Sequence, residues 1–198
     1  MNLSSKLLRI CTGVQAAAII AISMPVSTSY AAAPDPNWHV VKTQYKTDDY
    51  VIAGYEAKDF GISANGRTDV TEKIQTALDE LYKIGGGTLF LPAGRYVVKG
   101  TLKIPQGVIL AGDWQSPDEN NGKAAGTILM AYSGRGENDI NDNYDSETEN
   151  MPFITLEPNA SIKGINIWYP EQAPDNIVPT RRLFVCTTLK HGARTARE

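Results

Sequence analysis

Cysteine is nearly absent from this sequence of 198 residues, in which only Cys11 and Cys186 occur. Both lie near the ends of the chain, so the body between residues 32 and 180 has none. This absence excludes a disulfide framework for the body, whose stability must then come from the core of a large regular fold. Hydrophobic residues make up 42% of the chain, which is sufficient for such a core.

Histidine is also scarce, with His39 ahead of the regular patterns and His191 near the C-terminus. A Ser-His-Asp catalytic set is therefore not available, and there is no Cys/His cluster for a metal ion. Gly85, Gly86 and Gly87 do not indicate a phosphate-binding loop. They follow a helical pattern and precede a strand, which is the reverse of the P-loop order. The sequence thus predicts no cofactor.

Long apolar runs are absent except at the N-terminus. Residues 10–24 are apolar apart from small residues and one glutamine, and Lys6 and Arg9 precede or border this run. Residues 29–31 place small residues at −3 and −1 of a cleavage point, which predicts a signal peptide over residues 1–31 and a secreted, extracellular protein. A membrane anchor is the alternative, but the run is shorter than the roughly 20 residues that a spanning helix needs. We therefore expect no membrane span after signal removal.

The body also lacks positive charge. The formal net charge of the chain is −3, while residues 1–31 contribute +2 and residues 181–198 contribute +4. A charge of −9 therefore remains for residues 32–180. An acidic body argues against nucleic acid as a partner.

One amphipathic helix is predicted over about residues 70–84, after a mixed leader over residues 32–55. Asp69 and Glu72 have the spacing of a capping box at its start. Gly85 supplies its stop. Apolar residues recur at helical spacing and form one stripe, which must cover another part of the fold; they are Val70, Ile74, Ala77, Leu78 and Leu81.

Short β-branched segments punctuated by Gly and Pro follow the helix and predict strands. They lie at residues 88–91, 95–98, 102–104, 108–110, 125–130, 153–156 and 161–167. Turns of two to four residues are too short for helical crossovers, so the strands form either an antiparallel meander or successive sides of a coil. The recurrence of similar segments later in the chain favours the coil.

Six short motifs follow one another between residues 59 and 112. They are Asp59-Phe60-Gly61, Asn65-Gly66-x-Thr68-Asp69, Ile74-Gln75-x-Ala77-Leu78, Gly85-Gly86-Gly87, Leu91-Pro92-x-Gly94-x-Tyr96 and Gly107-Val108-x-Leu110-x-Gly112. In this order and spacing they resemble the opening of the pectate lyase superfamily domain. This superfamily includes rhamnogalacturonase-, polygalacturonase- and exo-β-1,3-glucanase-like enzymes. The resemblance implies an all-β fold, a single-stranded right-handed parallel β-helix (solenoid) with an N-terminal capping α-helix. Residues 56–180 would be its first coils, and the solenoid would be incomplete.

The same resemblance implies a carbohydrate-active protein with a polysaccharide partner, acting as a polysaccharide lyase or glycoside hydrolase whose catalytic coils are missing from this chain. A non-enzymatic β-helix, such as an adhesin or spike, is the alternative, as is an inactive truncated product. The sequence assigns no catalytic residue and no oligomeric state.

Four residues are candidates for substrate binding. Asp113 and Trp114 follow a predicted strand, and Trp168 and Tyr169 end another. Aromatic rings can stack on sugars, but a turn aspartate and packed aromatics are the simpler interpretations. Alternating acidic and amide residues from Asp139 to Asp145 resemble calcium ligands, although a solvated insertion is favoured because Tyr144 and Asn150 stand where such a loop needs Gly and Glu.

Residues 181–198 differ in character, being basic and without the rhythm of strands and turns. A solenoid needs further repeats or a polar terminal cap, and this tail resembles neither. We expect a lost reading frame or a truncation near Thr180, with a nucleic-acid-binding tail as the rival explanation.

Overall fold

The computed structural model describes residues 33–47, 49–116, 125–132, 152–177 and 183–187. The predicted signal peptide, the calcium-like segment and most of the basic tail lie outside these residues. The described chain is mostly β, with one α-helix and one short 3₁₀ helix. No helix within it is both long and apolar enough to cross a membrane.

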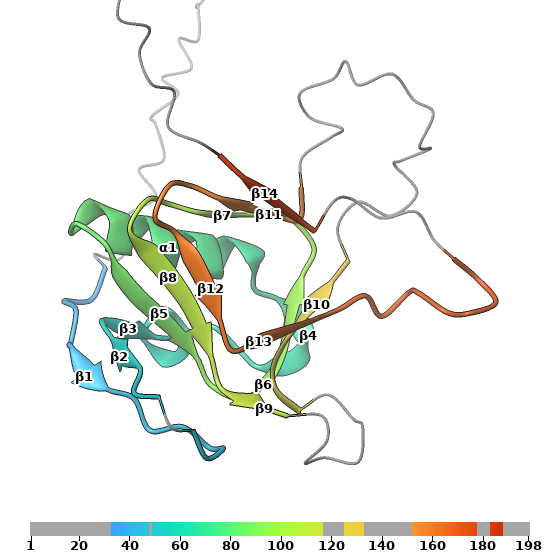
Figure 1. The fold of residues 1–198 in the computed structure, drawn as a ribbon, viewed down its shortest axis with the longest axis horizontal. Coiled ribbons are helices and arrows are strands. Elements are labelled where there is room, and N and C mark those ends of the chain that lie inside the picture. The colour runs from blue at the N-terminus through green and yellow to red at the C-terminus, as the bar shows by residue number, and fades with distance from the viewer. Residues whose placement is uncertain (1–32, 48, 117–124, 133–151, 178–182, 188–198) are drawn as a thin grey trace, which may run out of the picture. The chain divides into compact units, whose positions relative to one another are not determined.

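Three parallel sheets make up the body (Figure 1). The first contains β3 (Tyr55–Glu56), β5 (Gly87–Leu91), β8 (Val108–Gly112) and β12 (Ser161–Lys163). The second contains β4 (Asn65–Asp69), β6 (Gly94–Val98), β10 (Ala125–Ala131) and β13 (Ile165–Trp168), with β9 (Trp114–Gln115) antiparallel to β10. The third contains β7 (Leu102–Ile104), β11 (Ile154–Leu156) and β14 (Phe184–Cys186).

Apart from β9, which pairs with the following strand β10, consecutive strands of the three sheets enter different sheets. The chain passes from β5 to β6 to β7, then through β8, β10 and β11, and then through β12, β13 and β14. Each strand therefore pairs in parallel with its counterpart from the next circuit, and the register joins Leu89 to Leu110 and Tyr96 to Leu129. These parallel pairings exclude the antiparallel meander for the body.

Like residues stack in the core because the register repeats. Alternate residues of each strand point inward, and the inward set is almost wholly aliphatic or aromatic. Tyr96, Phe153, Leu89 and Leu110 are among the most deeply buried side chains. Tyr96 satisfies its hydroxyl by donating to the carbonyl of Pro92 at 2.8 Å.

Helix α1 (Thr71–Lys83) joins this core through Ile74, Ala77, Leu78 and Leu81, which are fully buried. This confirms the predicted apolar stripe. Its N-terminus differs from the predicted capping box, since Val70 is the N-cap and makes no side-chain cap bond.

Asp69 instead ends β4, and its carboxylate accepts hydrogen bonds from the backbone and hydroxyl of Thr71. Thr71 in turn accepts from the backbone N–H groups of Lys99 and Gly100. The start of the helix is therefore hydrogen-bonded to the turn after β6. These tertiary hydrogen bonds form in place of the predicted capping box.

Turn geometry occurs inside β4, where Asn65 accepts from the N–H groups of Arg67 and Thr68 and Gly66 has a φ of 66°. The register with β6 is irregular over this segment. Phe184–Cys186 pairs in parallel with Ile154–Leu156, so the predicted loss of strand rhythm after residue 180 does not hold for these three residues.

The leader covers the outer face of the first sheet. Its strands β1 (His39–Val40) and β2 (Ile52–Ala53) pair antiparallel, and 3₁₀ helix η1 (Ala57–Phe60) follows β3. Val41 and Ala53 pack on Phe90 and Ala111, which point away from the main core. The ring of Trp38 lies against the backbone of Gly54 in the leader and of Gly87 in β5.

Candidate functional site

A surface cavity of about 430 Å³ lies where the leader meets the end of β8. Three segments form its wall. The leader contributes Thr43, Lys46, Thr47, Asp49 and Val51, β8 and the residues after it contribute Gly112, Asp113 and Trp114, and the β12–β13 turn contributes Lys163, Gly164 and Ile165. Two of the four predicted site residues, Asp113 and Trp114, therefore border the same cavity.

Asp113 anchors the leader. Its side chain is only 3% exposed, and its carboxylate oxygens accept from the backbone N–H groups of Gln44 and Tyr45. Its own backbone N–H donates to Thr127 Oγ1 at 2.8 Å. A buried carboxylate needs such donors, and here they come from two successive leader residues. Asp113 thus positions one wall of the cavity.

Trp114 is a lining residue of the cavity and is 50% exposed. Its backbone is fixed by pairing with Gly126 in β9 and β10. The neighbouring turn is closely packed, since a Cβ on Gly164 would lie 2.6 Å from the carbonyl oxygen of Gly112. A half-exposed indole on a rigid turn offers an apolar face beside polar groups.

An ion pair joins two other residues that line the cavity. Lys163 Nζ lies 2.7 Å from Asp49 Oδ2, and both side chains are about half exposed or more. The hydrogen bond from Lys163, together with its charge, lowers the pKa of Asp49. An exposed pair of this kind contributes little to stability, so its relevance is the placement of one positive and one negative group at the cavity.

A second cavity, of about 330 Å³, lies across the leader from the first. It is lined by Gln44, Tyr45, Ala93, Gly94, Arg95, Ala125, Gly126 and Ile128. The guanidinium of Arg95 lies 5.6 Å from the ring centre of Trp168, within the range of a cation–π contact. Trp168 remains 43% exposed.

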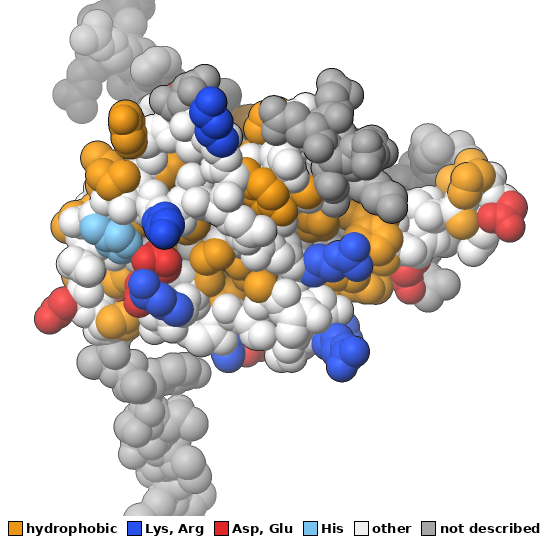
Figure 2. All heavy atoms as spheres, turned by 90° about the horizontal axis from the view of Figure 1, so that it is seen from below, with side chains coloured by type: hydrophobic (Ala, Val, Ile, Leu, Met, Phe, Trp, Pro, Cys, Tyr) orange, Lys and Arg blue, Asp and Glu red, His pale blue; other side chains and the backbone are white. Residues whose placement is uncertain are grey.

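Arg95 is a residue that sequence reasoning missed. The signal was its position in β6, one residue before the inward-facing Tyr96, which puts Arg95 on the outer face of the sheet. Figure 2 shows blue Lys and Arg side chains lying beside orange hydrophobic ones over the face seen from below.

Tyr169 does not lie with the other candidates. Its ring is 6.3 Å from that of Phe153 and it packs against the main core, where burial raises the pKa of its hydroxyl. Within the described residues, no cluster of three or more His, Cys, Asp or Glu side chains is arranged to hold a metal ion. The calcium-like segment lies outside the described residues.

Comparisons with known proteins agree with the sequence resemblance. The model of the family described as "Rhamnogalacturonase A/epimerase, pectate lyase-like" matches residues 55–175. An alginate lyase 7 from Azotobacter vinelandii is 45% identical over 56 residues, which are 28% of this chain and 6% of that protein. Mannuronan C5-epimerase AlgE1 of the same organism is 39% identical over 93 residues, covering 40% of this chain and 7% of the epimerase.

The tail spike protein of Shigella phage Sf6 is 35% identical over 114 residues, covering 55% of this chain and 16% of the spike. Among solved structures, the A-module of the Azotobacter vinelandii epimerase AlgE4 aligns with a TM-score of 0.33 and 23% identity, over 67% of this chain and 36% of that one. The chain therefore spans only a small part of the length of these curated relatives.

Proposed function

Because the chain belongs to the rhamnogalacturonase A/epimerase, pectate lyase-like family, we propose that it is part of a secreted carbohydrate-active protein that binds polysaccharide beside Trp114. Relatives named as an alginate lyase and as mannuronan epimerases support a polysaccharide partner. Lyase or hydrolase activity and the nature of the substrate are both part of this proposal. They concern the whole protein, of which the matched region is one part.

The proposal includes the architecture. We take the three sheets as the sides of a right-handed parallel β-helix, with α1 as its N-terminal cap. The circuit of consecutive strands through the three sheets supports the coil. Crossovers between parallel strands are right-handed in nearly all proteins, which supports the hand. The buried stripe of α1 supports a cap that shields apolar stacks from water.

The observation that carries the binding proposal is the half-exposed Trp114, which lines the same cavity as the charged residues Lys163 and Asp49. Ligand sites combine a concave, largely apolar surface with a few polar groups that fix orientation. The hydrophobic face of a sugar ring would stack on Trp114. Its hydroxyl or carboxylate groups would exchange hydrogen bonds with Lys163 and Asp49, which are already positioned by their ion pair.

Isothermal titration calorimetry with pectin-like and β-glucan polysaccharides tests this proposal. We expect saturable binding and a roughly tenfold weaker affinity for Trp114→Ala, which corresponds to about 1.4 kcal/mol. Tyr82→Ala is the matched control, since Tyr82 is a 53% exposed aromatic residue on α1. Unchanged affinity in Trp114→Ala would refute the cavity as the binding site. No binding of any polysaccharide in the panel would refute polysaccharide as the partner.

A second candidate function is a non-enzymatic binding or structural β-helix, which the 35% identity to the tail spike protein favours. Two measurements separate it from an enzyme. Release of reducing ends, or absorbance from unsaturated products, on the same polysaccharides indicates catalysis. Trimers by light scattering, with binding but no product, indicate a spike-like role.

A further inference from the structure

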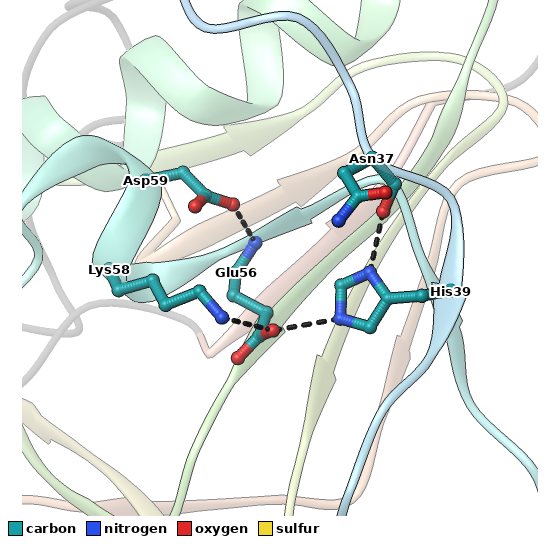
Figure 3. Close-up of polar contacts among 5 residues, drawn as sticks. All are labelled: Asn37, His39, Glu56, Lys58 and Asp59. Atoms are coloured by element: carbon teal, nitrogen blue, oxygen red, sulfur yellow. Dashed lines mark hydrogen bonds and ion pairs between the residues drawn. The ribbon is translucent and has the colours of Figure 1, made fainter.

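A polar cluster around His39 fastens the leader to the body (Figure 3). The imidazole belongs to β1, and its Nε2 lies 2.8 Å from Oε1 of Glu56 in β3. Its Nδ1 lies against the main-chain carbonyl oxygen of Asn37. Figure 2 shows a pale-blue histidine at the surface beside red and blue side chains.

Both ring nitrogens of His39 therefore face acceptors. The carbonyl oxygen of Asn37 and the carboxylate of Glu56 have no hydrogen to donate. A neutral imidazole carries one N–H and satisfies one of them, leaving a lone pair against the other oxygen. Only the imidazolium, with two N–H groups, donates to both.

The charged groups around His39 reinforce this preference. Lys58, from η1, donates to the same Oε1 of Glu56 at 2.8 Å, and Asp59 accepts from the Glu56 backbone N–H at 2.8 Å. The contact with Asn37, followed by that with Glu56, raises the pKa of His39, while Lys58 acts in the opposite direction. Glu56 keeps its Lys58 partner when His39 is neutral, while His39 then has one N–H for two acceptors, so loss of the proton weakens its contact with Glu56 or with Asn37.

What this contact holds is the edge of the leader. Next to His39, the leader pairs through Val41 N–H to the carbonyl of Val51 at 2.8 Å and through Asn37 N–H to that of Gly54 at 3.0 Å. The same segment buries Phe90 on the outer face of the first sheet. Its continuation forms a wall of both cavities.

We propose that His39 is a pH-sensitive clasp, which in its protonated form fastens β1 to Glu56 and in its neutral form holds that edge of the leader more weakly. The body remains folded in both states, because its three sheets and α1 do not depend on this contact. The action of the clasp does not require polysaccharide to be bound.

The sign follows from linkage. The pKa of His39 is raised in the folded chain above its ordinary value of 6.5, so the clasp is complete below 6.5 and is lost as the pH rises through the raised pKa. Burial raises the pKa of Glu56, but its contacts with Lys58 and His39 outweigh burial and lower it from 4.5. The ion pair therefore persists on the acid side until Glu56 takes up a proton at a pH below 4.5.

NMR titration of the full chain tests the proposal, because His39 and His191 are its two histidines. His39→Gln assigns the two ring signals. We expect His39 to titrate above the pH at which a histidine in a short unstructured peptide titrates. In parallel, the protection factors of the amides of Asn37 and Val41 should fall several-fold through the same transition, while that of Leu89 stays constant.

Two variants of the partners give opposite shifts. Glu56→Gln removes the anion and should lower the pKa of His39, whereas Lys58→Met removes a competing cation and should raise it. Leader protection in His39→Gln should no longer follow this pH profile. A His39 signal that titrates like the histidine of the unstructured peptide, or leader protection that is unchanged through its titration, would overturn the clasp.

Discussion

Thr127→Val is the perturbation that best tests how the site is built. Thr127 is fully buried, and its hydroxyl links three parts of the fold. It accepts from the backbone N–H of Asp113 at 2.8 Å, and its hydrogen is shared between the carbonyl oxygens of Leu91 at 2.6 Å and Pro92 at 3.1 Å. Valine has a similar shape but no hydroxyl, so the substitution removes these hydrogen bonds without opening a large cavity.

The size of the destabilisation follows from the backbone groups that lose the Thr127 hydroxyl as their partner. A buried polar group that loses its hydrogen bond costs about 1–3 kcal/mol. Leu91 O has a second acceptor position, so the loss at Asp113 N–H dominates, and we expect destabilisation of about 2–4 kcal/mol. In a chain of this size that lowers Tm by roughly 4–16 °C.

Urea denaturation followed by far-UV circular dichroism gives the free energy of unfolding. Thr127→Ser is the matched control, because it keeps the hydroxyl and loses one methyl group, at a cost of about 1 kcal/mol. The reasoning fails if Thr127→Val lies within about 0.5 kcal/mol of the wild type. It also fails if the serine variant is destabilised as much as the valine variant.

Two further predictions concern the turn after α1 and the helix itself. Gly85 and Gly86 both have positive φ. A Cβ added to Gly86 would lie 2.5 Å from the carbonyl oxygen of Gly107, whereas a Cβ added to Gly85 would have no other atom within 4 Å. Gly85→Ala should cost about 1–3 kcal/mol and Gly86→Ala clearly more, and equal midpoints in urea would contradict this. Leu81→Ala should cost about 2–5 kcal/mol, against less than about 1 kcal/mol for Tyr82→Ala, since Leu81 is fully buried and Tyr82 is half exposed; comparable Tm losses would contradict it.

Much of the fold was predictable because its signals are local. The apolar stripe of α1 and the Gly- and Pro-punctuated strands depend on the spacing of neighbouring residues, and the structure places the predicted helix at Thr71–Lys83. The predictions that differ from the structure concern contacts between residues far apart in the sequence. Strand β4 exists because β6 lies beside it, and Asp69 bonds to Thr71 and Lys99 instead of forming a box with Glu72.

The candidate site was predictable only in part. The positions of Trp114 and Trp168 at strand ends made them candidates, although packing was the simpler interpretation, and the structure leaves both about half exposed. The sequence did not show that the carboxylate of Asp113 accepts hydrogen bonds from the leader, because the two donors lie almost 70 residues earlier in the chain. It also did not show that Arg95 faces Trp168, since that contact depends on the register of three strands.

The sequence by itself determined the family, the single helix and the succession of short strands, because glycine turns and apolar spacing act over a few residues. The tertiary structure decided which of these strands lie side by side, since parallel pairing joins residues a whole circuit apart. It also decided the role of the leader. Asp113 and Glu56 hold that segment across the first sheet, and only there do Trp114, Lys163 and Asp49 border one cavity.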